Sequence, residues 1–215
     1  MPRQGNRVDT SVSMLPSDAA LQQDQSSTTA SVHIRPLQRA DARALHALIC
    51  ACPPLDVNSL YAYALLALHH ASTCFVAIRD GQLCGAVTGY IKPTQPDTYF
   101  LWQIAIAPNQ QGSGLGSALL DHVARYALQQ NNLHFLETTI SPGNMASQRL
   151  FRRFAQRHQV DCQQHSLFSA QEMQPIAMPE HTADSSNSFT HHDIELQGAE
   201  AHEAEDLYRI GAWQW

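Results

Sequence analysis

The sequence predicts an α/β (α+β) fold in which helices flank a mixed, mostly antiparallel sheet. Two observations carry this prediction. Asp80-Gly81 joins two β-rich runs, 73–79 and 82–92, and an Asp-Gly pair between such runs is a strong signal for an antiparallel hairpin. Further along, a strand pattern at 98–107 is followed by helical spacing at 115–127. With 215 residues, the chain is long enough for one well-packed domain with extensions.

The folded core is predicted over 32–160. Residues 1–31 are rich in Ser, Gln and Thr and lack hydrophobic periodicity, so we expect them to form a disordered leader. The elements expected at the start of the core are a strand at 32–35 and helices at 41–50 and 60–69. Pro53 and Pro54 separate the two helices, and Asn58 and Ser59 are good N-cap residues for the second one.

The second half of the core alternates between strands and helices. Residues 98–107 form a long apolar run closed by Pro108, and we expect it to be the central strand. The elements expected after it are a helix at 115–127, a strand at 133–140 and a helix at 144–157. Antiparallel pairing before this run and a strand-to-helix succession after it together predict the mixed sheet.

Residues 161–215 are predicted to be an acidic C-terminal extension. They hold ten acidic residues and only Arg209, a net charge of −9, whereas 1–160 hold nine acidic and twelve Lys/Arg residues, a net charge of +3. Within the extension, the polar stretch at about 180–192 is expected to be a disordered insertion, and Leu207–Ile210 a closing strand. Nucleic acid is disfavoured as a partner, because phosphate contacts need clustered cations and the chain has a single lysine.

The composition also excludes several other classes of protein. No apolar run approaches the roughly 20 residues of a membrane-spanning helix, and the N-terminus has no apolar core of the signal-peptide kind. The five cysteines are an odd number without a C-x-x-C pair, which argues against a disulfide framework and a cysteine zinc site. Tandem histidines at 69–70 and 191–192 lack a regularly spaced third ligand, so no metal is expected. We therefore expect a cytoplasmic protein.

The most informative segment is the glycine-rich loop at 110–117, between the central strand and a predicted helix. Glycines let backbone N–H groups approach a ligand closely, and a helix start favours a pyrophosphate. The simpler alternative is a tight turn without a ligand. A Walker A loop would need a Gly-Lys-Ser/Thr sequence, but Gly116 is followed directly by Ser117. A dinucleotide-binding fold would need an all-parallel sheet, which the predicted hairpin contradicts.

Two signatures resemble the GNAT acetyltransferase superfamily. Gln111-x-x-Gly114-x-Gly116, after an antiparallel meander, resembles its acyl-CoA loop, and the segment from Asn144 to Phe151 resembles its second signature. The resemblance, over roughly 34–154, implies a twisted mixed sheet splayed between its fourth and fifth strands, with acetyl-CoA as cosubstrate. The residues it implies for acetyl-CoA are Ile104, Ala105, Ile106, Gln111, Gly112, Ser113, Gly114, Leu115, Gly116, Ser117 and Asn144.

Four longer strings, at 53–63, 96–103, 136–140 and 202–211, resemble the diaminobutyrate acetyltransferases of ectoine biosynthesis. That resemblance implies transfer of an acetyl group from acetyl-CoA to the 4-amino group of L-2,4-diaminobutyrate. It also implies a cytoplasmic homodimer with a small diamino acid as its partner. Many members of the superfamily carry a tyrosine at the position of Phe151 as general acid, and Phe151 cannot donate that proton.

A diamino acid brings two ammonium groups and one carboxylate, so its pocket needs acidic side chains with hydroxyl or amide donors. The residues expected to bind it are Asp56, Tyr61, Trp102, Glu137, His202 and Glu205. The resemblance favours these roles over simpler ones: a helix cap for Asp56, core packing for Tyr61 and Trp102, and mere tail charge for Glu205. Glu205 is the predicted base, and Asp56 is expected to orient the amine. Water or Tyr61 would protonate the leaving thiolate.

Two other functions stay open on the sequence alone. One is a GNAT acetyltransferase for another small amine or polyamine. The other is a non-catalytic acyl-CoA-binding module, suggested by the phenylalanine at 151.

Overall fold

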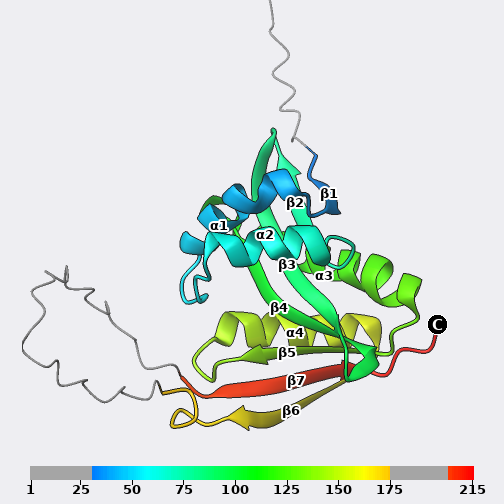
Figure 1. Cartoon of the computed structure of the whole chain (residues 1–215). Coiled ribbons are helices and arrows are strands. Elements are labelled where there is room, and N and C mark those ends of the chain that lie inside the picture. The colour runs from blue at the N-terminus through cyan, green and yellow to red at the C-terminus, as the bar shows by residue number, and fades with distance from the viewer. Residues whose placement is uncertain (1–30, 175–202) are drawn as a thin grey trace, which may run out of the picture.

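A seven-stranded sheet forms the centre of the computed structural model, which describes residues 31–174 and 203–215 (Figure 1). The strands are β1 (His33–Pro36), β2 (Phe75–Arg79), β3 (Gln82–Lys92), β4 (Gln95–Ile106), β5 (Phe135–Ile140), β6 (Asp161–Phe168) and β7 (Glu205–Gly211). The helices are α1 (Ala42–Cys50), α2 (Leu60–His69), α3 (Leu115–Val123) and α4 (Met145–His158). The strand order is β1-β2-β3-β4-β5-β7-β6, and only β4 and β5 pair in parallel. The predicted mixed, mostly antiparallel sheet is confirmed.

The hairpin between β2 and β3 turns at Asp80 and Gly81, as predicted. Both residues have positive φ angles, of 51° and 72°. A two-residue turn with positive φ at both positions matches the right-handed twist of the strands it joins, which is why Asp-Gly favours it.

Helices cover the sheet in two layers. One buried cluster joins Leu45 of α1 and Tyr63 of α2 to Val76 of β2. The other joins Leu119 of α3 and Phe154 of α4 to both halves of the sheet, including Phe75 next to Val76 on β2. Since neighbouring residues of a strand point to opposite faces, α1 and α2 lie on one face and α3 and α4 on the other.

Strands β4 and β5 diverge. They pair only at Thr98–Phe100 with Phe135–Glu137, after which β4 continues for six residues to Ile106 without pairing with β5. Figure 1 shows β4 running steeply away from β5 beyond this point. A β-bulge lies at the divergence, because Thr88 and Gly89 of β3 pair with Gln103 and Leu101 and leave Trp102 as the extra residue.

Several boundaries differ from the prediction. β4 begins at Gln95 rather than 98, because the β3–β4 turn is confined to Pro93 and Thr94. After α3 the helix continues as a π-helical turn at Ala124–Leu128. Strand β6 was not predicted at all, and β7 is longer than the predicted 207–210. Of the expected leader, residues 1–30 lie outside the described residues, as does the whole expected insertion at 180–192. Within the described parts of the chain, no helix is long and apolar enough to span a membrane.

Candidate active site

The glycine loop between β4 and α3 is open to its surroundings. Gly112 and Gly114 have φ angles of +76° and +83°, and a Cβ built on either would meet nothing within 4 Å. Gly114 is the N-cap of α3 in the left-handed conformation, which glycine adopts without steric cost. Gln111 ties the loop to the strand, because its Nε2 donates to the carbonyl of Ile106 at 3.3 Å.

The first turn of α3 presents backbone donors toward this loop. The N–H of Ala118 is the first in the helix to bond back, to the carbonyl of Gly114 at 3.1 Å. The N–H groups of Leu115, Gly116 and Ser117 therefore precede the intrahelical ladder, at the positive end of the helix dipole. Such a terminus is suited to a phosphate.

Ile104, Ala105 and Ile106 pair with β3 on one edge of β4, opposite Val87, Ala86 and Gly85. Their other edge faces the gap that β5 leaves. In an extended strand, every second residue directs its N–H and C=O groups toward a given edge. This edge of β4 therefore presents backbone donors and acceptors to an extended ligand between the diverging strands.

Helix α4 begins on the β5 side of the gap. Asn144 is its N-cap, and its side-chain oxygen accepts a hydrogen bond from the N–H of Ser147 at 3.1 Å. Phe151, about two turns after Asn144, is buried in the core cluster between sheet and helices. It therefore packs the core and has no proton to donate.

The connection between α1 and α2 carries Asp56. Its carbonyl accepts a hydrogen bond from Nε2 of Gln103 on β4 at 2.7 Å. Tyr61, in the first turn of α2, is 71% exposed, so it is not the core residue that helical spacing allowed. Trp102 is 37% exposed at the bulge, where β4 leaves β5, and is likewise not a buried core side chain.

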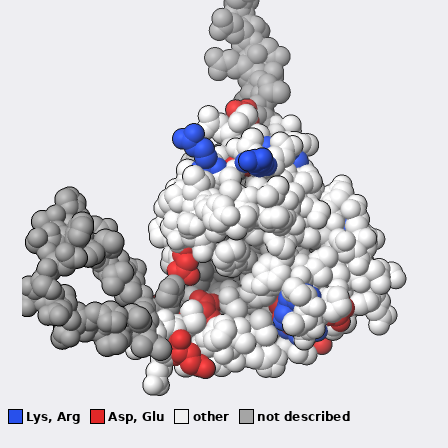
Figure 2. Space-filling model, viewed as in Figure 1, with Lys and Arg blue, Asp and Glu red and all other residues white. Residues whose placement is uncertain are grey.

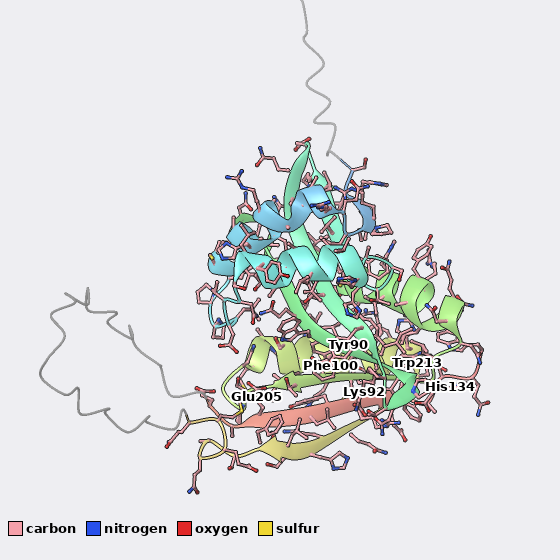
Figure 3. All side chains as sticks on the ribbon, in the orientation of Figure 1. Tyr90, Lys92, Phe100, His134, Glu205 and Trp213 are labelled. Atoms are coloured by element: carbon pink, nitrogen blue, oxygen red, sulfur yellow. The ribbon has the colours of Figure 1, made fainter. Side chains whose placement is uncertain are left out.

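Glu205 lies at the start of β7, beside the end of β5. Its Oε1 accepts a hydrogen bond from Ser141 Oγ at 2.8 Å, and Ser141 directly follows β5. Figure 3 shows Glu205 at the end of β7 opposite the one where Lys92 and His134 lie. In Figure 2, acidic side chains gather along one side of the hollow between the α1–α2 layer and the lower strands. His202 lies outside the described residues.

Glu137, one of the residues expected to bind the substrate, is buried in the sheet and paired with two cations. Its side chain is 3% exposed, with Oε2 accepting from Lys92 Nζ at 2.6 Å and Oε1 from Arg209. Arg209 also lies over the ring of Phe135, 3.7 Å from its centroid. Both oxygens of Glu137 are therefore bound to cations of the protein itself, on the segment where β4 and β5 still pair.

Sequence reasoning missed two polar residues of this region. Gln103 is buried and holds the Asp56 segment on β4, and Ser141 holds Glu205. The signal for Gln103 was its amide inside the apolar run 98–107. Ser141 had no comparable signal, because its partner is 64 residues away in the sequence.

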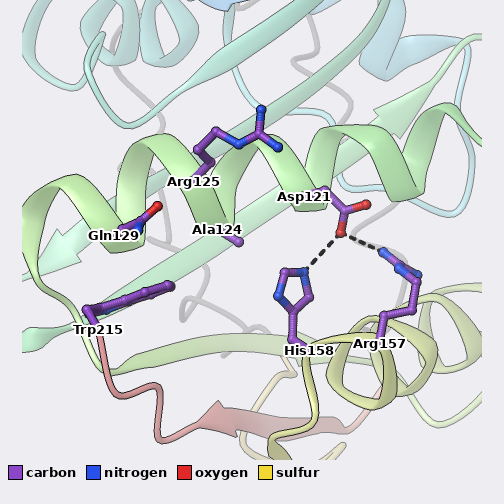
Figure 4. A pocket seen from close by; sticks show the side chains of 7 residues that line it. All are labelled: Asp121, Ala124, Arg125, Gln129, Arg157, His158 and Trp215. Carbon is purple, nitrogen blue, oxygen red and sulfur yellow. Dashed lines mark hydrogen bonds and ion pairs between the residues drawn. The ribbon is translucent and has the colours of Figure 1, made fainter.

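A separate cavity of about 330 Å³ lies at the opposite ends of α3 and α4 (Figure 4). Asp121 accepts there from Arg157 at 2.8 Å and pairs with His158 at 3.1 Å. Trp215 closes one side. The cavity is lined by residues at the C-terminal ends of α3 and α4, whereas the glycine loop lies at the N-terminus of α3. The two sites are therefore remote from each other. Among the described residues, no group of three or more His, Cys, Asp or Glu side chains could hold a metal ion.

Comparison with known proteins agrees with this geometry. The model of the acetyltransferase (GNAT) family matches residues 42–155, from α1 to α4. The chain belongs to the GNAT acetyltransferase family.

Relatives narrow the assignment further. The L-2,4-diaminobutyric acid acetyltransferase of Bordetella parapertussis is 42% identical over 65% of this chain and 75% of the relative. That of Halomonas elongata is 43% identical over 62% and 69%. The solved structure of the diaminobutyrate acetyltransferase EctA from Paenibacillus lautus, in complex with L-2,4-diaminobutyric acid and coenzyme A, has a TM-score of 0.70 and 28% identity over 85% of this chain and 96% of that one. Within the GNAT family, this chain belongs with the diaminobutyrate acetyltransferases.

Proposed function

We propose that this chain transfers an acetyl group from acetyl-CoA to the 4-amino group of L-2,4-diaminobutyrate, giving N4-acetyl-L-2,4-diaminobutyrate for ectoine biosynthesis. The observation that carries the proposal is the divergence of β4 and β5 after Phe100. It leaves the glycine loop at the end of β4 and Ser141, with its partner Glu205, at the end of β5. The names of the relatives, at 36–45% identity, support diaminobutyrate as the acceptor.

The residues present fit acetyl-CoA. The N–H groups from Gln111 to Ser117 would hold the pyrophosphate, and the β5-facing edge of Ile104–Ile106 would hold the pantetheine arm, with Asn144 on the other side of the gap. Acetyl-CoA supplies an activated acyl thioester. A main-chain N–H near Ile104 would stabilise the negative charge that develops on the carbonyl oxygen.

The acidic groups suit a diamino acid. An alkyl amine such as the attacking group has an ordinary pKa of about 10.4, so it must lose a proton before it attacks. We assign Glu205 as the acceptor of this proton, directly or through water, with one carboxylate oxygen fixed by Ser141. Asp56 would orient the diamine, with Tyr61 and Trp102 as walls of the pocket and His202 as a further contact. Water or Tyr61, which is largely exposed, would protonate the thiolate that leaves.

Glu137 has no direct substrate contact in this proposal. Its carboxylate is buried and paired with Lys92 and Arg209, so a substrate ammonium would have to displace one of these cations. We assign it to the stability of the sheet beside the site.

The first experiment is acetyl-CoA-dependent thiol release by the purified protein with 2,4-diaminobutyrate, ornithine, lysine, putrescine or no amine. Mass spectrometry would identify the acetylated nitrogen. We expect a strong preference for diaminobutyrate and acetylation of its 4-amino group. Preference for another amine would support a different GNAT acetyltransferase. Retained acetyl-CoA binding without any turnover would support a non-catalytic acyl-CoA-binding module.

Two charge-removing variants test the assigned roles. Glu205→Gln is expected to lower kcat by about 10²- to 10⁴-fold, the usual contribution of a general base. Asp56→Asn is expected to raise the KM for diaminobutyrate more than it lowers kcat. Glu172→Gln, at an exposed position between β6 and β7, is the matched control. If Glu205→Gln leaves turnover unchanged while Asp56→Asn abolishes it, Glu205 is not the base.

We also propose that the enzyme is a cytoplasmic homodimer that has neither nucleic acid nor a membrane as a partner. The five cysteines are free thiols, as is usual in a reducing compartment. Large apolar side chains are exposed on and before α2, namely Val57, Leu60 and Leu68, which is typical of a surface covered by a partner chain. Light scattering coupled to gel filtration should give twice the chain mass of 23.8 kDa. A monomer would contradict this part of the proposal.

A further inference from the structure

Gln103 is a buried amide on β4 that hydrogen-bonds to the connection between α1 and α2 and to α2 itself. It lies on β4 next to the bulge residue Trp102. Its Nε2 donates to the carbonyl of Asp56 at 2.7 Å, and its Oε1 accepts from the hydroxyl of Tyr63 at 3.2 Å. That hydroxyl in turn accepts from the N–H of Asn58 at 3.2 Å. Gln103 and Tyr63 are 5% and 0% exposed, so water does not compete for these bonds.

This network adds polar contacts to a segment that is only partly buried. Pro53, Pro54, Asp56 and Val57 are exposed in the connection between α1 and α2, and Leu55 packs partly buried against the core cluster of α1 and α2. Besides the network, a buried anchor at the start of the segment is Cys52, whose thiol donates to the carbonyl of Ile106 at 3.3 Å. The main chain of Asp56 is thus fixed to β4 by the side chain of Gln103.

The position of Gln103 on β4 also bears on the proposed function. Gln103 lies in the part of β4 that has left β5, between the bulge at Trp102 and the residues Ile104–Ile106. Under the proposed function, these neighbours face the pocket and the acetyl donor. One side chain therefore connects the strand that would hold the donor to the segment that carries Asp56.

We propose that Gln103 is a positioning residue for the amine substrate: through the Asp56 carbonyl and the Tyr63 hydroxyl, it sets the distance between the Asp56 segment and the acetyl-holding edge of β4. This inference rests on the proposed function. An apolar side chain of similar size would fill the space but remove both the donor to the Asp56 carbonyl and the acceptor of the Tyr63 hydroxyl proton, so the segment would shift to replace these hydrogen bonds.

The test compares Gln103→Leu, Gln103→Glu and Tyr63→Phe with the wild-type full chain in steady-state acetyl transfer. For Gln103→Leu we expect the KM for diaminobutyrate to rise about tenfold, as two lost hydrogen bonds imply, and the KM for acetyl-CoA to stay within about twofold. Preference for diaminobutyrate over ornithine should fall, because the segment is no longer held at a fixed distance. Tyr63→Phe should show the same pattern to a smaller extent.

Gln103→Glu adds a pH-dependent measurement that would show no effect if Gln103 only stabilised the fold. Its side chain can donate to the Asp56 carbonyl only when protonated, so the ratio of its KM for diaminobutyrate to the wild-type KM should fall as the pH is lowered. For Gln103→Leu the same ratio should stay constant with pH. Gln95→Leu, an exposed glutamine at the start of the same strand, is the matched control and should behave as wild type.

The outcomes separate this inference from the proposed function. A wild-type protein without turnover on diaminobutyrate overturns both. An active wild type with a folded Gln103→Leu variant whose KM for diaminobutyrate is unchanged overturns only the inference. So does a variant in which both KM values and kcat change together, since that pattern indicates a general loss of fold rather than misplacement of one segment.

Discussion

Glu137→Gln tests what the buried carboxylate does. The change keeps the shape of the side chain but leaves Lys92 and Arg209 without the anion that they share. The Glu137 side chain is 3% exposed, and those of the two cations are 26% and 25% exposed. Removing one partner from a fully buried pair costs about 3–5 kcal/mol. Because each cation keeps part of its hydration, we expect a loss of about 2–3 kcal/mol in the free energy of unfolding.

For a chain of this length, that loss corresponds to a fall in Tm of about 4–12 °C. Thermal and urea denaturation near neutral pH, followed by tryptophan fluorescence, would measure it. Lys92→Met is the comparison variant, because it leaves Glu137 paired with Arg209 and should cost less. The double variant should be more stable than the sum of the single effects predicts, since the two residues interact directly.

An unchanged Tm in Glu137→Gln would refute the assignment of Glu137 to sheet stability. If the same variant also raised the KM for diaminobutyrate, the substrate contact expected from the sequence would be supported instead. Measuring stability and KM on one preparation therefore distinguishes the two roles of Glu137.

Two further predictions concern backbone conformation and pH. Gly114→Ala should lower the free energy of unfolding by about 1 kcal/mol, because the φ angle of Gly114 is +83°. Gly116→Ala should not lower it, because Gly116 is at a helical position with room for a Cβ. Equal losses of stability for the two variants in urea denaturation would contradict this prediction. The hydrogen bond from Arg35 lowers the pKa of Asp41 below its ordinary 3.8, so the contribution of Asp41 to stability is complete above that pH and is lost as the pH falls through the lower folded-state pKa. Asp41→Asn should remove this part of the acid unfolding curve, and a curve of unchanged shape would show that the pair contributes nothing.

Local signals determined much of the fold. The Asp80-Gly81 turn and the 60–69 helix with its Ser59 cap are fixed by neighbouring residues, through φ preferences and capping. The glycine loop before α3 belongs to the same group. Its conformation depends on residues without a Cβ, which the sequence shows directly.

Pairing between segments far apart in the sequence could not be predicted from such local signals. Strand β6 has mostly exposed side chains and no apolar alternation, and it is a strand because β7 supplies its hydrogen bonds. The bulge at Trp102 reverses which face of β4 each later residue occupies, and no local pattern specifies a bulge.

The same distinction between local signals and long-range contacts applies to the candidate site. The sequence by itself determined the conformation of the glycine loop, because its positive φ angles require glycines at fixed positions. Tertiary structure alone decided that Glu137 is neutralised by cations 45 and 72 residues away, and that Gln103 holds a carbonyl 47 residues away. A charged or polar side chain has no fixed role until folding supplies its partners, because the cost of burying it is offset only by groups that the chain brings into contact in three dimensions.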